Sequence, residues 1–156
     1  MKPYRVYVDT SVFGGCFDEE FSVESLHFFD DARNGRLLLL ISDVVINELA
    51  KAPETVRAIV TNLPPEVFEI LPITGEVESL RDAYIAAGVV SSRSLDDATH
   101  VAAATVGRAD AIVSWNFRHI VHLDKIKGYQ MVNLTNGYGI LTILSPAAVI
   151  SNESNN

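Results

Sequence analysis

The sequence lacks the features of a membrane protein or of a small protein held together by disulfides. Cys16 is its one cysteine, so no internal disulfide can form, and a single thiol fits a reducing compartment. Its longest apolar run, Leu37 to Ile41, is far shorter than the roughly 20 residues that a membrane-spanning helix needs. The opening residues MKPYRVYVDT reach a charge too soon for a signal peptide. We therefore expect a cytoplasmic protein.

Positive charge is also scarce. The chain has 12 Lys and Arg against 20 Asp and Glu, which gives a formal net charge of −8. Nucleic-acid binding usually leaves a basic surface, so this balance argues mildly against such a ligand. Net charge describes solubility and steering, however, and a few clustered arginines can bind phosphate locally. An acidic excess is also expected where carboxylates gather around a cation.

Several common active-site motifs are absent. No histidine pair has zinc-ligand spacing, and a lone cysteine cannot build a thiolate site. Gly14-Gly15 belongs neither to a P-loop nor to a dinucleotide fingerprint; a tight turn or an opening beside an active site is its expected use. There is no G-x-S-x-G elbow, which argues against a serine hydrolase.

What the sequence does contain is an alternation of strand and helix patterns. We expect strands at 4–8, 37–41, 67–71, 111–114 and 140–144, and helices at 22–33, 43–51, 54–62, 75–87, 94 or 95–106 and 122–134. Ser42 and Thr74 are the expected caps of two helices. The pattern predicts one α/β domain over residues 1–150, with a parallel sheet covered on both faces, and a flexible polar tail at 151–156.

Three carboxylates occur where an apolar element should continue. Asp9 ends the first strand in VDTSV, Glu48 lies among apolar residues in VVINELA, and Asp97 lies near the start of an alanine-rich helix. In parallel sheets, ligands gather outside the carboxyl ends of the strands, where Asp9 is expected. Two carboxylates about 4 Å apart repel by on the order of 4 kcal/mol at an effective dielectric near 20. A divalent cation reverses that sign, and oxygen ligands suit Mg²⁺ or Mn²⁺.

Each of these residues, taken singly, also has a structural explanation. Asp9 could be a cap or a turn residue, and Glu48 could be a solvated helix position. Asp97, beside Asp96, could belong to a first-turn pair that the helix dipole favours. The joint pattern is what favours a metal site that orients a phosphodiester and activates a water.

Four motifs, VDTSV, ELA, DDATHVAAA and IVSWNF, follow one another in an order and spacing that resemble the PIN domain. The resemblance runs from Tyr4 to about Ala147 and is strongest to the VapC-type toxins. It implies a three-layer α/β/α sandwich with a central parallel sheet. It also implies an acidic cleft that binds Mg²⁺ or Mn²⁺ and cuts RNA.

The resemblance assigns roles residue by residue. Asp9, Glu48 and Asp97 take the first three acidic positions, which are the catalytic and metal-binding ones. Asn116 takes the fourth catalytic position, which is often aspartate in the family; the lost charge leaves the number of ions open. Ser11, next to Thr10, matches a hydroxyl that commonly orients the first aspartate or a metal-bound water.

Other residues near these motifs have two interpretations each. Arg118 and His119 could contact phosphate or could be solvated surface residues. Trp115 and Phe117 could stack on a base or could pack the corner after the strand. His100, one turn beyond Asp97, is expected to be structural or to support the site from behind.

Three functions remain open from the sequence. The first is a metal-dependent endoribonuclease with RNA as substrate; the VapC-like resemblance further implies a toxin with an antitoxin partner that fills its cleft, and a homodimeric state. The second is a non-catalytic binding module of the same fold, which Asn116 and the acidic composition motivate. The third is a small-molecule phosphohydrolase acting through Asp9. Aspartyl phosphatases usually have Asp-x-Asp, whereas Ser11 stands in the second place here.

Overall fold

The computed structural model describes residues 2–151. In chain order, its strands and α-helices are β1 (Tyr4–Val8), α1 (Thr10–Gly15), α2 (Ser22–Arg33), β2 (Leu37–Ser42), α3 (Asp43–Ala50), α4 (Glu54–Thr61), β3 (Phe68–Leu71), α5 (Gly75–Ala86), α6 (Leu95–Val106), β4 (Ala111–Val113), α7 (Leu123–Thr135) and β5 (Thr142–Leu144). Short 3-10 helices lie at Pro65–Val67, Ser92–Ser94 and Pro146–Ala148. Among the helices of residues 2–151, none combines the length and the apolar composition that a membrane span requires.

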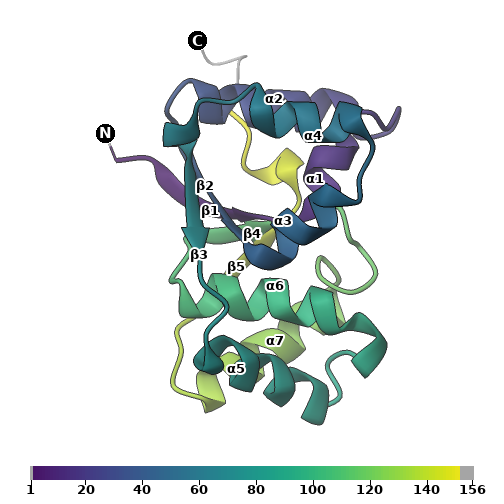
Figure 1. Cartoon of the computed structure of the whole chain (residues 1–156). Coiled ribbons are helices and arrows are strands. Elements are labelled where there is room, and N and C mark those ends of the chain that lie inside the picture. The colour runs from purple at the N-terminus through teal and green to yellow at the C-terminus, as the bar shows by residue number, and fades with distance from the viewer. Residues whose placement is uncertain (1, 152–156) are drawn as a thin grey trace.

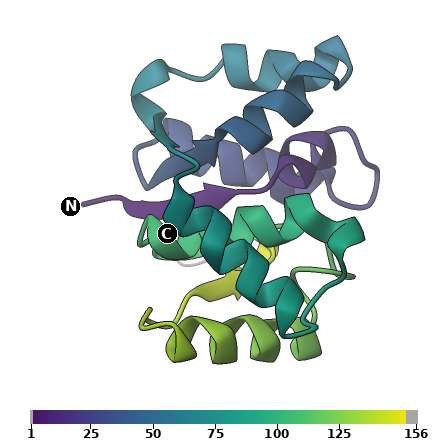
Figure 2. The same ribbon diagram turned by 60° about the horizontal axis from the view of Figure 1, so that its bottom comes forward.

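The five strands form one parallel sheet in the order β3-β2-β1-β4-β5. The chain first adds β2 and β3 on one side of β1, and then adds β4 and β5 on the other side. Right-handed crossovers in opposite directions put their helices on opposite faces of a sheet. Accordingly, α1 to α4 lie on one side and α5 to α7 on the other (Figures 1 and 2). The predicted three-layer α/β/α sandwich is confirmed.

Burial on both faces explains the composition of the central strands. Val6, Tyr7 and Val8 in β1 are at most 2% exposed, and Ile112 and Val113 in β4 are fully buried. A strand covered on both sides needs apolar residues at every position rather than at alternate ones. The strand direction then brings the carboxyl ends of β1 and β4 together at one edge of the sheet.

Helix α6 packs against the sheet through small side chains. Ala98, Ala102, Ala103 and Ala104 are at most 1% exposed. Because α6 leads directly into β4, it runs back along the sheet and begins near the carboxyl ends of the strands. Its first turn, which carries Asp97, is thereby placed beside Asp9.

Most predicted element boundaries agree with the structure within two residues, but local roles differ. Thr74 caps α5 as expected, with its hydroxyl accepting the Val77 N–H at 3.3 Å. Ser42 stands at the N-cap position of α3, but its side chain makes no capping bond there. Val89 and Val90, in the connection between α5 and α6, are buried in the core.

Gly14-Gly15 does not form a tight turn. Both glycines lie inside α1, where Gly15 has a packing role. A Cβ on Gly15 would lie 2.5 Å from the Ser25 hydroxyl oxygen and 2.7 Å from Trp115 Nε1. The glycine therefore lets α1 approach α2 and the segment after β4.

Ser151, which the sequence assigns to the polar tail, is held in place. Its N–H and its hydroxyl both donate to the buried Asp31 carboxylate at 2.8 Å. The rest of the predicted tail, residues 152–156, lies outside the described residues.

We expect Gly15→Ala to lower the free energy of unfolding by about 1–3 kcal/mol, because the new methyl group overpacks a filled contact. Trp115 has little room to yield, since it stacks on Phe21 and donates to Ser25. Urea denaturation followed by tryptophan fluorescence measures the change. The matched control is Gly14→Ala, where a Cβ meets nothing within 4 Å. Equal stability of the two variants would contradict the close approach.

Candidate metal centre

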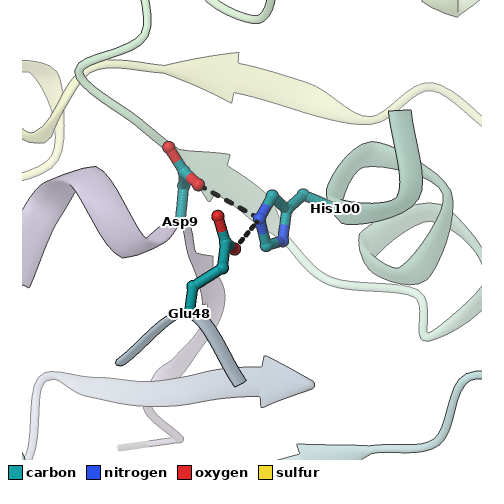
Figure 3. Close-up of side chains that lie close together, drawn as sticks. All are labelled: Asp9, Glu48 and His100. Atoms are coloured by element: carbon teal, nitrogen blue, oxygen red, sulfur yellow. Dashed lines mark hydrogen bonds and ion pairs between the residues drawn. The ribbon is translucent and has the colours of Figure 1, made fainter. Parts of the chain in front are cut away.

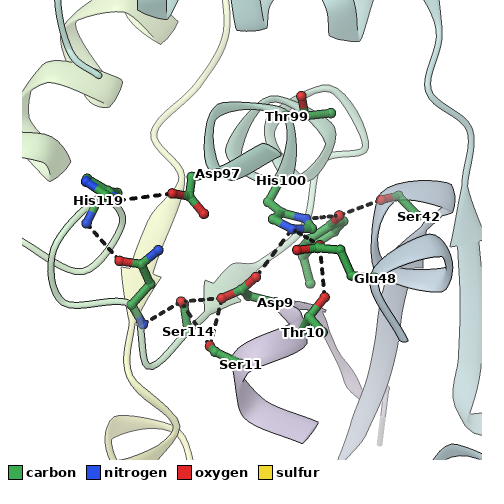
Figure 4. Close-up of polar contacts among 12 residues, drawn as sticks. Asp9, Thr10, Ser11, Ser42, Glu48, Asp97, Thr99, His100, Ser114 and His119 are labelled. Carbon is green, nitrogen blue, oxygen red and sulfur yellow. Dashed lines mark hydrogen bonds and ion pairs between the residues drawn. The ribbon is translucent and has the colours of Figure 1, made fainter. Parts of the chain in front are cut away.

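The candidate site lies where the strand order reverses, between the carboxyl ends of β1 and β4. Asp9 follows β1 directly, and Ser114 follows β4 directly. Glu48 comes from α3, and Asp97 comes from the first turn of α6. Such a switch point is where open α/β sheets bind ligands. The structure thus brings the predicted carboxylates to one region of the molecule (Figure 4).

Asp9 is 5% exposed and is fixed by two serine hydroxyls. Ser11 Oγ and Ser114 Oγ each donate to Asp9 Oδ2 at 2.7 Å. Both hydroxyl oxygens in turn accept a backbone N–H, from Trp115 and Asn116 respectively, at 2.9 Å. Because those N–H groups can only donate, the hydroxyl protons are left to point at the carboxylate. Asp9 Oδ1 remains turned toward the other site residues.

Glu48 and His100 complete a compact cluster with Asp9 (Figure 3). His100 Nε2 lies 2.7 Å from Glu48 Oε1 and 3.3 Å from Asp9 Oδ1. Thr10 Oγ1 donates to the same Glu48 oxygen at 3.0 Å. Within the described part of the chain, ligand atoms of Asp9, Glu48 and His100 all lie within 4.8 Å of one another. The His100 ring is only 1% exposed, so the cluster has a buried side and an open side at the half-buried Glu48.

A buried hydrogen-bond chain holds His100 from behind. Tyr7 Oη lies 2.8 Å from His100 Nδ1 and 2.6 Å from Ser42 Oγ. Tyr7 and Ser42 are both fully buried. Burial raises the pKa of Tyr7 far above its usual range, so the hydroxyl stays protonated. Ser42 thus serves the site with the hydroxyl that was expected to cap α3.

Asp97 lies next to this cluster but has its own partners. Its Oδ2 is 3.2 Å from His119 Nδ1, and it is not a member of the group of ligand atoms within 4.8 Å. The Asn116 side-chain oxygen accepts the backbone N–H of His119 at 2.9 Å and that of Arg118 at 3.2 Å. The four predicted positions therefore form two subsets, with Asp9 and Glu48 around His100 and with Asp97 and Asn116 beside His119.

The pKa shifts show how the charges oppose one another. Burial, and then the charge of Asp9, raise the pKa of Asp97, while the charges of His100 and His119 oppose the rise. Burial alone would lower the pKa of His100, but its hydrogen bond with Glu48 and the surrounding carboxylates raise it. At Glu48, burial raises the pKa, but the hydrogen bond and the charge of His100, together with Thr10 and Lys51, outweigh burial and lower the pKa. His100 is thus the buried group that offsets the repulsion between the acids.

The donor set fits a divalent cation. Two carboxylates and an imidazole are ordinary ligands for such ions. An octahedral ion with bonds near 2.1 Å separates adjacent ligand atoms by about 3.0 Å. The separations of 2.7 Å and 3.3 Å from His100 Nε2 lie on either side of that value. The residues can therefore share one ion without large rearrangement.

The sequence indicates a structural or supporting role for His100, and it does not single out Tyr7 or Ser114. His100 stands three residues after Asp97, and residues at that spacing share a helix face, so its approach to the acids could have been anticipated. Ser114 carries a weaker signal, as a hydroxyl directly after a buried strand.

The aromatic residues beside the site differ in role. Trp115 packs the corner, because it stacks on Phe21 at 4.2 Å between ring centroids and donates to Ser25. Phe117 is 47% exposed, and Arg118 is exposed.

Comparisons with known proteins show a similarity of fold to a solved structure. No protein-family model matches this chain. No curated protein matches it either. Among solved structures, a chain of VapBC2 from Rickettsia felis, bound to a DNA fragment from their promoter, superimposes with a TM-score of 0.53. The match is 13% identical and covers 73% of this chain and 89% of the other. The fold is PIN-like. At this identity the likeness concerns the fold alone, and the PIN-like sheet is what positions the carboxylates.

The pair of His100 and Glu48 should make the stability of the metal-free protein depend on pH. The folded-state pKa of His100 is raised, so its contribution is complete below its usual value of about 6.5 and is lost as the pH rises through the raised pKa. The pKa of Glu48 is lowered, so its contribution is complete above about 4.5 and is lost as the pH falls through the lowered pKa.

We therefore expect Glu48→Gln to lower the melting temperature in EDTA more at pH 6 than at pH 9. Once the pH has risen above the raised pKa of His100, its charge is lost, and the variant then relieves repulsion with Asp9. Circular dichroism melting measures both differences. Glu54→Gln, in the exposed first turn of α4, controls for the loss of a carboxylate as such. A difference for Glu48→Gln that is independent of pH would count against the charged pair.

Proposed function

We propose that this protein is a metal-dependent endoribonuclease that hydrolyses RNA phosphodiester bonds, as the VapC-like resemblance implies. The observation that carries the proposal is the convergence of Asp9, Glu48 and Asp97 beside the switch point of a PIN-like sheet. Carboxylates from three separate elements would repel without a cation. The stability of the core alone does not explain why these carboxylates lie together.

Asp9 and Glu48 are the proposed metal-holding residues. Ser11 and Ser114 keep Asp9 Oδ2 occupied, so Oδ1 is the oxygen directed at an ion. Thr10 donates to Glu48 Oε1, the oxygen that also faces His100, and so fixes the Glu48 side chain. When bound, Mg²⁺ or Mn²⁺ supplies Lewis acidity at the phosphodiester and lowers the pKa of a water.

Asp97 is the third proposed catalytic carboxylate. It is near enough to Asp9 for that charge to raise its pKa, and it contacts His119. There it can bind the same ion or accept the proton of the attacking water, and a raised pKa favours proton acceptance. Asn116 orders the turn that carries His119, through the backbone N–H bonds to its side-chain oxygen.

RNA is the proposed substrate, with phosphate contacts from the exposed side of the site. Arg118 is exposed and adjoins His119, so its guanidinium provides positive charge near the acids and the His119 imidazole provides a further polar group. Such local charge suffices for a phosphate despite the net charge of −8. The acidic balance also suits a basic partner, and an antitoxin segment that offers a basic side chain to Asp9 and Glu48 is the proposed inhibitor. A homodimer is the proposed assembly.

We expect Asp97→Asn to reduce RNA cleavage by about 100-fold or more, because several kcal/mol of transition-state stabilisation are lost and 1.36 kcal/mol corresponds to a factor of ten. Cleavage of a fluorogenic RNA with Mn²⁺ measures the loss. The matched control is Asp96→Asn, the exposed neighbour in the same helical turn, which should retain activity. The melting temperature of Asp97→Asn should not fall, since its folded environment disfavours the carboxylate. Full activity in Asp97→Asn would defeat the mechanism.

Metal addition should stabilise the wild-type protein and not Asp9→Asn. At a free Mn²⁺ concentration 100 times Kd, the gain is about 2.7 kcal/mol, or roughly 5–10 °C in Tm for a domain of this size. Differential scanning fluorimetry with and without EDTA measures the shift. An unchanged Tm at millimolar Mn²⁺ would favour the non-catalytic binding module. A shift without RNA cleavage would separate metal binding from nuclease activity.

A further inference from the structure

The ring of His100 lies against both Asp9 and Glu48, the two carboxylates that would otherwise form a metal site with oxygen ligands only. Its Nε2 atom lies 2.7 Å from Glu48 Oε1 and 3.3 Å from Asp9 Oδ1, between the two oxygens that face the proposed ion (Figure 3). Any cation held by both oxygens must therefore lie within a few ångströms of this nitrogen. The state of Nε2 then decides whether the site attracts or repels the ion.

Electrostatics excludes one of the two arrangements when a cation is bound. An N–H on Nε2 would direct its positive end at the cation, whereas a bare nitrogen presents a lone pair. The ring has little room to turn aside, because it is 1% exposed and its other nitrogen is bonded to Tyr7. A metal held by the two oxygens that face Nε2 therefore favours His100 as a third ligand.

A metal ligand needs the tautomer in which Nε2 carries no proton, and the hydrogen bonds on the Nδ1 side of the ring are compatible with it. With the proton on Nδ1, His100 donates to Tyr7 Oη, and Tyr7 donates to Ser42 Oγ. Both hydroxyls can donate or accept, so the chain can also run the opposite way in the metal-free protein and put the proton on Nε2. Metal-binding histidines typically donate their second ring nitrogen to such a partner, which fixes their orientation.

We propose that His100 is a metal ligand and that Tyr7 positions it, so that the site is a mixed nitrogen and oxygen site formed by Asp9, Glu48 and His100. This inference rests on the divalent metal of the proposed function. Imidazole nitrogen suits first-row transition ions, whereas Mg²⁺ prefers oxygen and retains its water. The site therefore selects a transition ion such as Mn²⁺ over Mg²⁺ more strongly than carboxylates alone would.

The decisive experiment is pulsed electron paramagnetic resonance on the metal-free full chain loaded with Mn²⁺ alone. A directly bound imidazole gives a nitrogen modulation in the electron spin echo, and ¹⁵N-histidine labelling changes its frequency. We expect this modulation in the wild type and its loss in His100→Gln. His119→Gln is the control, because His119 is the other histidine that contacts a site carboxylate, and it should keep the signal.

Titration calorimetry with MnCl₂ and with MgCl₂ tests the selectivity. His100→Gln should weaken Mn²⁺ binding at least about tenfold and lower the ratio of Mn²⁺ to Mg²⁺ affinity. Tyr7→Phe should weaken Mn²⁺ binding about 10- to 100-fold, the usual effect of removing a partner of a ligand. Tyr84→Phe is matched to it, since Tyr84 is also fully buried and donates to Asn133 at 2.5 Å, away from the site. It should lose stability and keep its Mn²⁺ affinity.

The outcomes separate this inference from the proposed function. If Mn²⁺ binds without nitrogen modulation and RNA is still cleaved, His100 is only a hydrogen-bond donor and the nuclease stands. If the modulation is present and RNA is not cleaved, the ligand assignment stands and the nuclease fails. If the wild type binds no Mn²⁺, both fail. The wild-type spectrum needs no variant, so a misfolded His100→Gln does not prevent a decision.

Discussion

The constraint on which the site depends is that the sheet forces acidic groups together in a buried place. Asp9 has no freedom to withdraw, because its backbone N–H bonds to the Val113 carbonyl at 3.1 Å as an extension of the β1–β4 pairing. Glu48 and Asp97 arrive from helices that are anchored in the core through Val45 and Ala98. The hydrophobic packing on both sides of the sheet thus holds in place an arrangement that its charges oppose.

Hydrogen bonds with hydroxyl groups and with His100 lower the free-energy cost of burying these carboxylates. Ser11 and Ser114 satisfy one oxygen of Asp9, and Thr10 and His100 satisfy one oxygen of Glu48. Buried acids survive in proteins when they are hydrogen-bonded in this manner. Asp9 Oδ1 accepts from no hydroxyl among the described residues and faces His100. Among those residues, Glu48 likewise keeps its second oxygen without a hydroxyl donor. These oxygens leave capacity for a cation.

The sequence predicts the sandwich and the acidic positions, but not how the acids are divided. Alternating strand and helix patterns define the parallel sheet, and Asp9 is conspicuous because it interrupts a buried strand. The role of His100 depends on the rotation of α6 against the sheet, which no local pattern specifies. Ser42 looks like a cap by local rules, and only the approach of Tyr7 from another strand gives its hydroxyl a different partner. Gly15 is explained by Trp115, a contact far along the chain.

Asp9 and Glu48 lie around His100, whereas Asp97 lies beside His119, and this division determines where negative charge is concentrated in the proposed mechanism. Beside Asp97, the fourth position is Asn116, a neutral residue whose oxygen is already used by two backbone N–H groups. An aspartate there would add negative charge next to a carboxylate whose pKa burial and Asp9 already raise. With asparagine, and with His119 close by, the negative charge near Asp97 is reduced, while Asp9 and Glu48 keep theirs. The stronger attraction for a cation therefore lies on the side of Asp9 and Glu48, and Asp97 is left freer to handle a proton.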